Sequence, residues 1–417
     1  MEPSIDHGNA AERIMAAKRQ LARRRAALRR AFAEVSEQIA REVDEVVGAQ
    51  AHGRSVIPEI AHAAIAGGQI PAQAMAEIRR RGVLIIRGVY PRQQVEDWND
   101  QLAGYIADNN YDTTPRGPVH DRYFTNLKAA RPQIFGIYWS KPQIMARQHP
   151  AMAEARRFLN RLWLHEGGGI SHFDPDRECT YADRVRRREP GDQSFGLSPH
   201  MDAGSVERWI DPAYGVVYAN VFNGNWRAHD PFQAVGRAEV REIPSPAVCS
   251  MFCTFQGWTA LTPQGPGDGT LRVIPILNAV IYMLLRALQD DVPEDSLCGA
   301  EPGRALSALP EWHAPLLPAL QSIPLVEPGD AVFWHPDLVH AVEDTHRGRG
   351  MSNVIYIGAA PWCAKNAAFL PRQADAFLAG RSSPDFAPED HEVNYAGRAT
   401  SGDLTPLGRR QMGLEKW

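Results

Sequence analysis

The spacing of apolar positions changes several times along the chain, and each spacing predicts a different element. Between residues 9 and 50 apolar side chains recur at roughly helical intervals without a proline, which predicts a long amphipathic helix or a helical pair. Residues 72–80 also have a helical pattern. Val83–Val89 is instead a continuous apolar run, typical of a buried strand, and an amphipathic helix follows Pro91.

From residue 200 onward the pattern becomes one of short apolar runs separated by Gly and Pro, which predicts many short strands. A more helical stretch at 277–322 interrupts them, and the tail 364–417 is helical at first and then irregular. Many short strands without βαβ alternation favour a mainly β fold with helical additions (α+β), a jelly roll or sandwich. The expected strands are 180–186, 216–218, 247–252, 257–261, 270–275, 331–334 and 352–358.

Composition places the chain among ordinary globular proteins. It has 417 residues, 44% of them hydrophobic and 23% charged, and a net charge of −4, which does not indicate nucleic acid or a membrane as a partner. The five cysteines are scattered and odd in number, so a reducing compartment fits best. No apolar run is long enough to cross a bilayer, and we expect a cytoplasmic protein.

The first predicted helix contains a block of basic residues from Lys18 to Arg30. Such a block would suit a nucleic acid, but no aromatic side chains interleave with it, as a surface for single strands would require. We interpret it as a solvated helix face whose partners are glutamates later in the segment. The same helix is a candidate surface for self-association into a homo-oligomer.

His200 and Asp202 are the strongest candidates for chemistry. Side chains two residues apart on a strand point to the same face, so this imidazole and this carboxylate offer two adjacent ligands. A second histidine from another strand, His340, would complete a set of two histidines and one carboxylate. Non-haem Fe(II) oxygenases use that set, which leaves coordination positions open. His335 is an alternative to His340, but it directly follows Trp334 and fits the end of a strand better.

The order of several segments resembles the phytanoyl-CoA-dioxygenase-like oxygenases, and within that group it is most similar to the YbiU-like proteins. The segments that carry the resemblance are 83–89, 198–209, 225–232, 258–261, 269–275, 327–330, His340 and 353–361. The resemblance implies a cupin-like double-stranded β-helix over residues 71–410 with a helical insertion at about 277–322, after an N-terminal helical extension over 1–70. It also implies that His200, Asp202 and His340 hold Fe(II), with 2-oxoglutarate as cosubstrate, molecular oxygen as oxidant and a small molecule as substrate.

The chain departs from the wider group at one position. There, an arginine about eleven residues after the distal histidine pairs with the far carboxylate of 2-oxoglutarate, whereas this chain has Met351. A buried carboxylate needs a cation or several hydrogen-bond donors. Arg349, Arg272 and Ser352 are the candidates for this role, with Arg208 as a further basic residue near the metal stretch.

Three functions remain open on the sequence. The first is an Fe(II)- and 2-oxoglutarate-dependent dioxygenase that hydroxylates a small molecule. The second is a cupin-type metalloenzyme that works without 2-oxoglutarate. The absence of an arginine at position 351 keeps this alternative open. The third is a non-catalytic jelly-roll binding protein, although such a protein would not require three convergent metal ligands.

Overall fold

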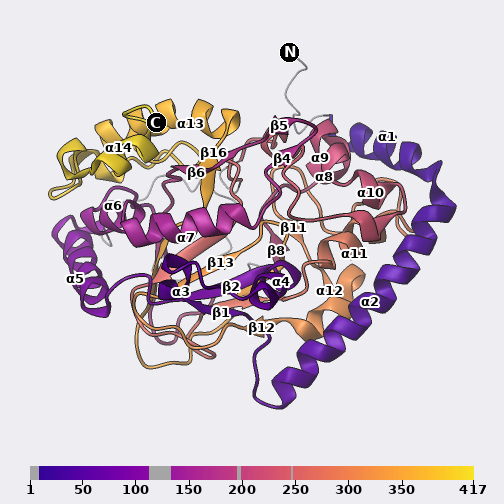
Figure 1. Ribbon diagram of the computed structural model, residues 1–417, viewed down its shortest axis with the longest axis horizontal. Helices are drawn as coiled ribbons and strands as arrows, with labels where there is room; N and C mark the ends of the chain where they lie inside the picture. The colour runs from indigo at the N-terminus through magenta and orange to yellow at the C-terminus, as the bar shows by residue number, and fades with distance from the viewer. Residues whose placement is uncertain (1–8, 112–132, 195–198, 246–247) are drawn as a thin grey trace.

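The computed structural model describes residues 9–111, 133–194, 199–245 and 248–417. The predicted helical pair is confirmed as α1 (Ala10–Ala22) and α2 (Arg25–Ala51). Helix α2 runs along one side of the molecule (Figure 1) and buries Leu28, Val35 and Ile39. Removing such a side chain from water stabilises a protein by about 1.5–3 kcal/mol, so this face binds the helix firmly to the body.

The larger sheet has seven strands and is antiparallel except at one edge, where the first two strands are parallel. Its strands β2, β13, β9 and β15 are almost wholly buried, as their apolar sequences predict. In spatial order the strands are β1 (Glu59–Ala61), β2 (Val83–Arg87), β13 (Ala331–Trp334), β9 (Gln256–Ala260), β15 (Ser352–Tyr356), β7 (Val185–Arg188) and β3 (Ile134–Phe135).

The second sheet has five short antiparallel strands. In spatial order they are β11 (Leu306–Ser307), β8 (His200–Met201), β14 (His340–Val342), β10 (Leu271–Val273) and β12 (Gln321–Ser322). Within the described residues neither sheet closes into a barrel. The architecture is therefore a mixed α and β fold with several sheets, and the predicted jelly roll remains a prediction.

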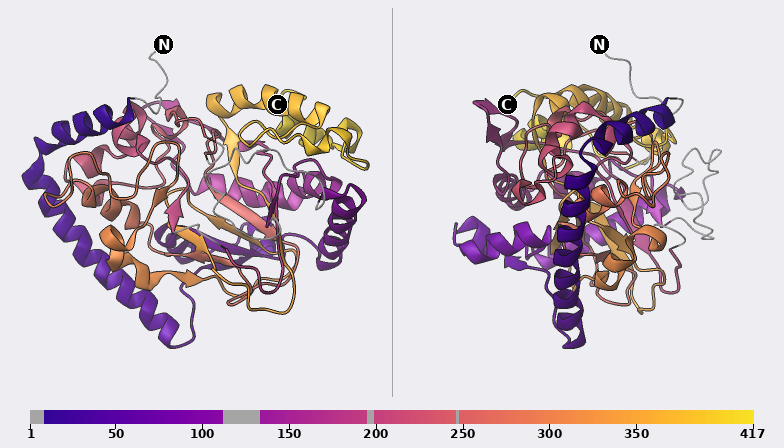
Figure 2. Two further views of the ribbon diagram at one scale, coloured as in Figure 1. Left: turned by 180° about the vertical axis from the view of Figure 1, so that it is seen from behind. Right: turned by 90° about the vertical axis from the view of Figure 1, so that its right-hand side faces the viewer.

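Helices surround the two sheets, and Figures 1 and 2 show α1 and α2 at one end of the molecule and α5, α6, α13 and α14 at the other. Two small sheets pair β16 (Ala360–Trp362) with β6 (Asp174–Cys179), and β4 (Glu166–Gly167) with β5 (Ile170–Ser171). The remaining helices are α3 (His62–Ala66), α4 (Ala72–Arg81), α5 (Arg92–Asp108), α6 (Lys141–Arg147), α7 (Pro150–Arg161), α8 (Glu207–Ile210), α9 (Pro212–Val217), α10 (Ala219–Phe222), α11 (Ala279–Arg286), α12 (Pro310–His313), α13 (Ala364–Ala379) and α14 (Pro406–Met412), with 3₁₀ turns η2 (Trp226–Ala228), η3 (Arg237–Glu239), η4 (Ala314–Ala319), η5 (His391–Asn394) and η6 (Ser401–Asp403).

The predicted strand at 216–218 is wrong, because the structure has helix α9 there. Asp211 caps the helix by accepting hydrogen bonds from the backbone N–H groups of Ala213 and Tyr214, and Pro212 occupies its first turn. These are strong helix-start signals. They outweigh the strand preference of the two valines that follow. The strand expected at 247–252 is also absent from the described part of that range, 248–252, and residue 247 lies outside the described residues.

The segment 277–322 contains helices α11 and α12, but its last part is not purely helical. Strands β11 and β12 form the two edges of the five-stranded sheet. The segment therefore contributes backbone to the sheet that carries His200 and His340. The predicted division of the chain into domains remains a prediction.

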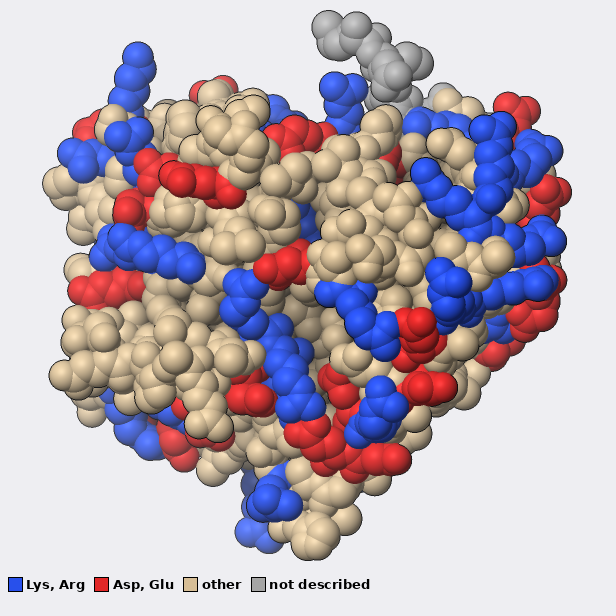
Figure 3. Space-filling model, turned by 45° about the vertical axis from the view of Figure 1, so that its right-hand side comes forward, with Lys and Arg blue, Asp and Glu red and all other residues tan. Residues whose placement is uncertain are grey.

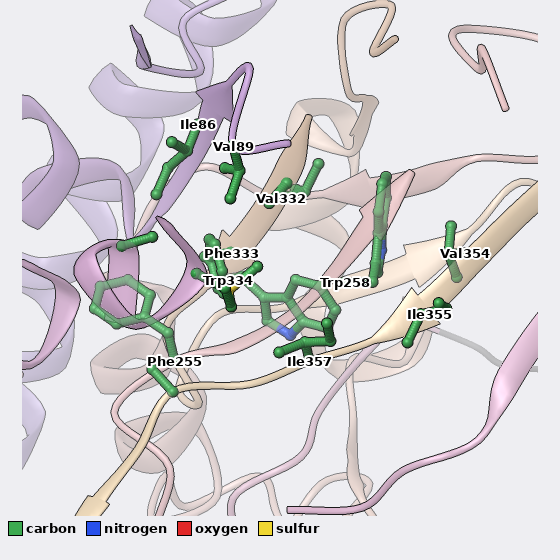
Figure 4. Close-up of a cluster of buried hydrophobic side chains, with 14 of the residues drawn as sticks. Ile86, Val89, Phe255, Trp258, Val332, Phe333, Trp334, Val354, Ile355 and Ile357 are labelled. Carbon is green, nitrogen blue, oxygen red and sulfur yellow. The ribbon is translucent and has the colours of Figure 1, made fainter. Parts of the chain in front are cut away.

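The hydrophobic core lies against the seven-stranded sheet. Figure 4 shows Phe333, Trp258, Val354 and Ile355 on neighbouring strands of this sheet, as members of one cluster that occupies both of its faces. A second cluster joins α2 to α11 and to Met201 of β8. Helix α2 and strand β8 thus belong to the same core cluster.

The basic face of the first two helices has acidic partners. Arg25 and Arg29 both pair with Asp290, which lies outside the N-terminal segment where glutamate partners were expected, whereas Glu34 of α2 pairs with Arg227. Figure 3 shows acidic side chains among the basic ones over the face that contains these helices. In the part of the chain that the structure describes, no helix has the length and apolar character needed to cross a membrane.

Candidate metal centre

His200 and His340 lie directly opposite each other on neighbouring antiparallel strands. Strands β8 and β14 pair with these two residues in register. Cross-strand partners project to the same face of a sheet, so the pairing brings both imidazoles together, with ring centroids 4.4 Å apart. The structure thereby joins two residues that are far apart in the sequence.

Asp202 follows β8 and completes the cluster. Its Oδ1 lies 3.3 Å from Nε2 of His200, and its Oδ2 lies 3.2 Å from Nε2 of His340. The two histidine side chains are buried, with 7% and 8% exposed, whereas Asp202 is 30% exposed. Among the described residues, these three form a group whose potential ligand atoms all lie within 4.8 Å of one another.

Hydrogen bonding leaves the Nε2 atom of His340 available to a metal. Nδ1 of His340 lies 3.1 Å from the carbonyl oxygen of Leu338, to which it donates as Nδ1–H. The lone pair is then on Nε2, the nitrogen that faces Asp202. A backbone carbonyl that fixes the tautomer in this way is typical of metal-ligating histidines.

The cluster is strongly coupled electrostatically. Burial raises the pKa of Asp202, but His340 and His200 lower it by more, so that this pKa lies well below its ordinary value. Burial lowers the pKa of His340, while the Asp202 carboxylate raises it by more, and the net change is upward. Asp202 is therefore ionised, and its negative charge favours a cation beside it.

The spacing of the three residues fits one divalent cation. Nitrogen and oxygen ligands lie about 2.1 Å from such a cation, so adjacent ligands of an octahedral site are about 3.0 Å apart. The two measured separations, 3.2 and 3.3 Å, are close to that value. The donor set is two nitrogens and one oxygen on one side of the would-be ion, which leaves the other side open.

A cavity of about 150 Å³ lies beside the cluster, with walls from both large sheets. The five-stranded sheet contributes Leu271 and Val342, and the seven-stranded sheet contributes Trp258, Trp334 and Tyr356. The ring of Trp334 lies 5.1 Å from that of His340 and shields it from solvent. Trp209 and Trp226 do not line the cavity and belong to the core cluster beside α2.

The residues predicted to bind the far carboxylate of a cosubstrate do not line this cavity. Arg349 is exposed in the turn before β15. Arg272 follows Leu271, whose side chain lines the cavity, so the side chain of Arg272 projects to the opposite face of the strand. There it donates to the carbonyl of Leu320. Ser352 is buried on β15, where its hydroxyl donates to Oε1 of Gln264 at 2.8 Å. The further candidate, Arg208, binds Asp337.

The sequence reasoning missed Arg186, which is buried and lines the cavity from β7. Its guanidinium donates to Oε1 of Gln264 at 2.9 Å and to the hydroxyl of Ser352 at 3.4 Å. Burial lowers the pKa of Arg186. The predicted strand at 180–186 overlaps β7 only at residues 185 and 186, so it did not indicate which face of the sheet Arg186 occupies.

His335 lies in an aromatic cluster and does not line the cavity. Its ring stacks on Trp163 at 4.8 Å, and Nδ1 accepts a hydrogen bond from the backbone N–H of Asp337. Nε2–H then donates to the carbonyl of Pro231. Burial lowers the pKa of His335 to about 3, so it is neutral. These contacts shape the turn that leads to His340.

Asp337, in the same turn, connects it to the segment that follows β8. It accepts from Arg208 at 2.7 Å and from Arg237 at 2.6 Å, and all three side chains are buried. Tyr218 also donates to it, at 3.0 Å. Arg208 lies six residues after Asp202, so this ion pair ties the segment after β8 to the segment before β14.

Comparison with known proteins gives consistent similarities over nearly the whole chain. The model of the family described as Gig2-like matches residues 9–414. The Escherichia coli (strain K12) protein YbiU is 46% identical over 386 residues, which cover 92% of this chain and 91% of YbiU. The expected similarity to YbiU-like proteins is thus confirmed, while the wider resemblance to phytanoyl-CoA-dioxygenase-like oxygenases remains a prediction.

Two solved structures extend the comparison. A protein from Salmonella typhimurium LT2, whose name proposes an oxidoreductase, is 43% identical, with a TM-score of 0.91 and 97% of both chains covered. GlcNAc Inducible Gene 2 of Candida albicans is 28% identical, with a TM-score of 0.82 and 100% of this chain and 91% of that one covered.

Proposed function

The chain belongs to the Gig2-like family, and from the geometry of its metal cluster we propose that it is a non-haem Fe(II)- and 2-oxoglutarate-dependent dioxygenase that hydroxylates a small molecule. The observation that carries the proposal is the convergence of His200, Asp202 and His340 at one end of a cavity between two sheets. Three protein ligands on one side of an ion leave room for a chelating cosubstrate and for oxygen.

The proposed function is accompanied by a proposal about how the two large sheets are arranged. We propose that the seven-stranded and five-stranded sheets are the two sheets of a double-stranded β-helix. Strands β8 and β14, which carry the histidines, would be neighbours on its smaller sheet. Walls from both sheets around one cavity support this reading.

When bound, Fe(II) would activate oxygen, with 2-oxoglutarate decarboxylated to succinate as one oxygen atom enters the substrate. The chain's own residues hold the metal ligands in position and shield them from water. The Leu338 carbonyl fixes the ring of His340, Asp202 keeps its negative charge, and Trp258 and Trp334 keep water away from the cluster. The name of the Salmonella protein agrees with this class of chemistry.

A cupin-type metalloenzyme that works without 2-oxoglutarate is the second candidate. The observation in its favour is that neither Arg272 nor Arg349 lines the cavity. An enzyme of this kind would use the same three ligands but would bind its substrate to the metal without a 2-oxo acid.

The test is anaerobic titration of the metal-free protein with Fe(II) and then 2-oxoglutarate. We expect one equivalent of Fe(II) to bind and 2-oxoglutarate to produce a weak visible charge-transfer band. His200→Ala and His340→Ala should abolish both, whereas His52→Ala, at an exposed histidine on the end of α2, should abolish neither. Stoichiometric iron binding without the band, and without succinate on exposure to air, would favour the second candidate. Undiminished iron binding by both variants would refute the site.

A further inference from the structure

Arg186 is a buried arginine whose partners are neutral, as those of Arg188 are, but unlike Arg188 it lines the cavity of the candidate site. It donates to Gln264 and Ser352, and its Nε has no partner among the described residues. By contrast, Arg156 pairs with Glu178. Arg188, two residues along the same strand, is held by the backbone carbonyls of Gly269, Glu343 and Asp192.

No described carboxylate neutralises Arg186 directly. Burial lowers its pKa, and Tyr356 and then Glu343 raise it by less. That carboxylate already accepts hydrogen bonds from the backbone N–H groups of Gly267 and Gly269 and from the hydroxyl of Ser322. A buried charge without a counter-ion is costly, and because Arg186 lines a cavity, an anion from outside the chain can reach it.

The position of Arg186 identifies where that anion would lie. Arg186 lines the cavity that also contains His200, Asp202 and His340, and it approaches from the opposite sheet. Tyr356 lines the same cavity, and burial raises its pKa while the charge of Arg186 lowers it.

The register of β7 explains how Arg186 can replace the arginine expected on β15. Arg186 pairs with Val354, which places it diagonally across from Ser352. The 3.4 Å contact between its guanidinium and the Ser352 hydroxyl shows that both project to the same side. Ser352 directly follows Met351, the position where the resemblance expects an arginine.

We propose that Arg186 is the carboxylate-binding residue of the cavity and that it pairs with the carboxylate of a 2-oxo diacid remote from the metal. Gln264 and Ser352 orient the guanidinium from behind. This rests on the proposed function for the identity of the diacid, whereas the carboxylate site itself depends only on the contacts of Arg186. The residue is a specificity determinant, because it distinguishes a 2-oxo acid with a second carboxylate from one without it.

The experiment compares two ligands of equal chain length by calorimetry on protein loaded with Zn(II), which supports no turnover. The wild type should bind 2-oxoglutarate at least tenfold more tightly than 2-oxopentanoate, which lacks the far carboxylate. Arg186→Gln should abolish that preference, and Arg186→Lys should retain part of it. Arg349→Gln, which removes an exposed charge outside the cavity, is the matched control and should retain the full preference.

Two further measurements separate this proposal from its alternatives. Thermal unfolding distinguishes a ligand role from a structural one. Relief of the unpaired charge should leave Arg186→Gln as stable as the wild type or more so, and a large loss of melting temperature would overturn the proposal.

Glutarate binding to metal-free protein separates the carboxylate site from the metal proposal. If Zn(II) fails to bind, loss of glutarate affinity in Arg186→Gln would still support the carboxylate site. Equal affinity of wild type and Arg186→Gln for glutarate would overturn it.

Discussion

Asp337 connects both halves of the candidate site without lining its cavity. Burial raises its pKa, but Arg237 and Arg208 lower it by more, and the carboxylate remains ionised between the two guanidinium groups. Because Arg208 follows Asp202 and Asp337 precedes His340, the ion pair fixes the relative position of the ligands. Its effect on metal binding is through positioning.

At Asp337 we predict that Asp337→Asn destabilises the protein by about 3 kcal/mol or more, because it leaves two buried cations with a neutral partner. It should also weaken Fe(II) binding, since the turn before His340 loses its anchor. Urea unfolding and metal titration measure the two effects. Asp344→Asn, at an exposed position in the following segment, is the control and should change stability by less than about 0.5 kcal/mol. Unchanged stability in Asp337→Asn would contradict this role of the ion pairs that Asp337 forms.

At the scale of elements, strand β9 depends on a glycine for its fit between β13 and β15. A Cβ atom on Gly257 would lie 2.3 Å from Cδ1 of Phe333 and 2.9 Å from the carbonyl oxygen of Ile357. Phe333 and Ile357 belong to the packed cluster shown in Figure 4, where there is little room for either to move.

We therefore predict that Gly257→Ala destabilises the protein by about 1–3 kcal/mol through overpacking. Gly215→Ala is the matched substitution. Gly215 lies in helix α9 with open space at its Cβ position, so alanine should be neutral or stabilising by up to about 1 kcal/mol. Thermal unfolding of the two variants gives the comparison, and equal stabilities would show that β9 tolerates a side chain at this position.

Helix α2 also contributes to the stability of the fold, because its buried face belongs to the core cluster that contains Met201 of β8. Val35 is wholly buried in the cluster that contains Met201, whereas Ala40 is on the exposed face of the same helix. We predict that Val35→Asp destabilises the protein by about 3 kcal/mol or more, since it buries a charge. Ala40→Asp, the control, should cost less than about 1 kcal/mol. Similar unfolding curves for both variants would instead support a separable N-terminal extension.

At the scale of the whole molecule, Glu392 links the C-terminal segment to the body of the protein. It is buried and accepts hydrogen bonds from the backbone N–H groups of Tyr138 and Trp139 and from the hydroxyl of Tyr105. Burial raises its pKa from 4.5 to about 7, even though these donors lower it. The folded protein therefore binds a proton more tightly at this carboxyl than the unfolded chain does.

The sign of the pH dependence follows from this shift. A group with a raised pKa contributes its full stability below about pH 4.5 and loses it as the pH rises to about 7. The loss is about 3 kcal/mol from the size of the shift. We predict that Glu392→Gln flattens the stability profile between these values. Urea unfolding from pH 4.5 to 8 tests it, with Glu166→Gln, at a 76% exposed side chain, as control. A wild-type slope retained in Glu392→Gln would refute this assignment.

The sequence by itself determined the elements whose pattern is strong and local. The apolar runs that became β2, β13 and β15 and the helical spacing of α1 and α2 were readable, because periodicity fixes which faces are buried. The spacing of His200 and Asp202 also predicted that they lie together, although β8 ends at Met201 and Asp202 lies just after it. The helix α9 was misread because capping by Asp211 outweighed β-branched propensity.

Only the tertiary structure decided which strands pair and in which register. Register placed His340 opposite His200, and it placed Arg186 beside Ser352, although nothing in the local sequence distinguishes Arg186 from its neighbours Arg187 and Arg188. The Arg208–Asp337 ion pair was hidden for the same reason. A strand's own pattern specifies its buried face, whereas its neighbours are chosen by the packing of the whole chain, and that packing determines which charged side chains share a cavity.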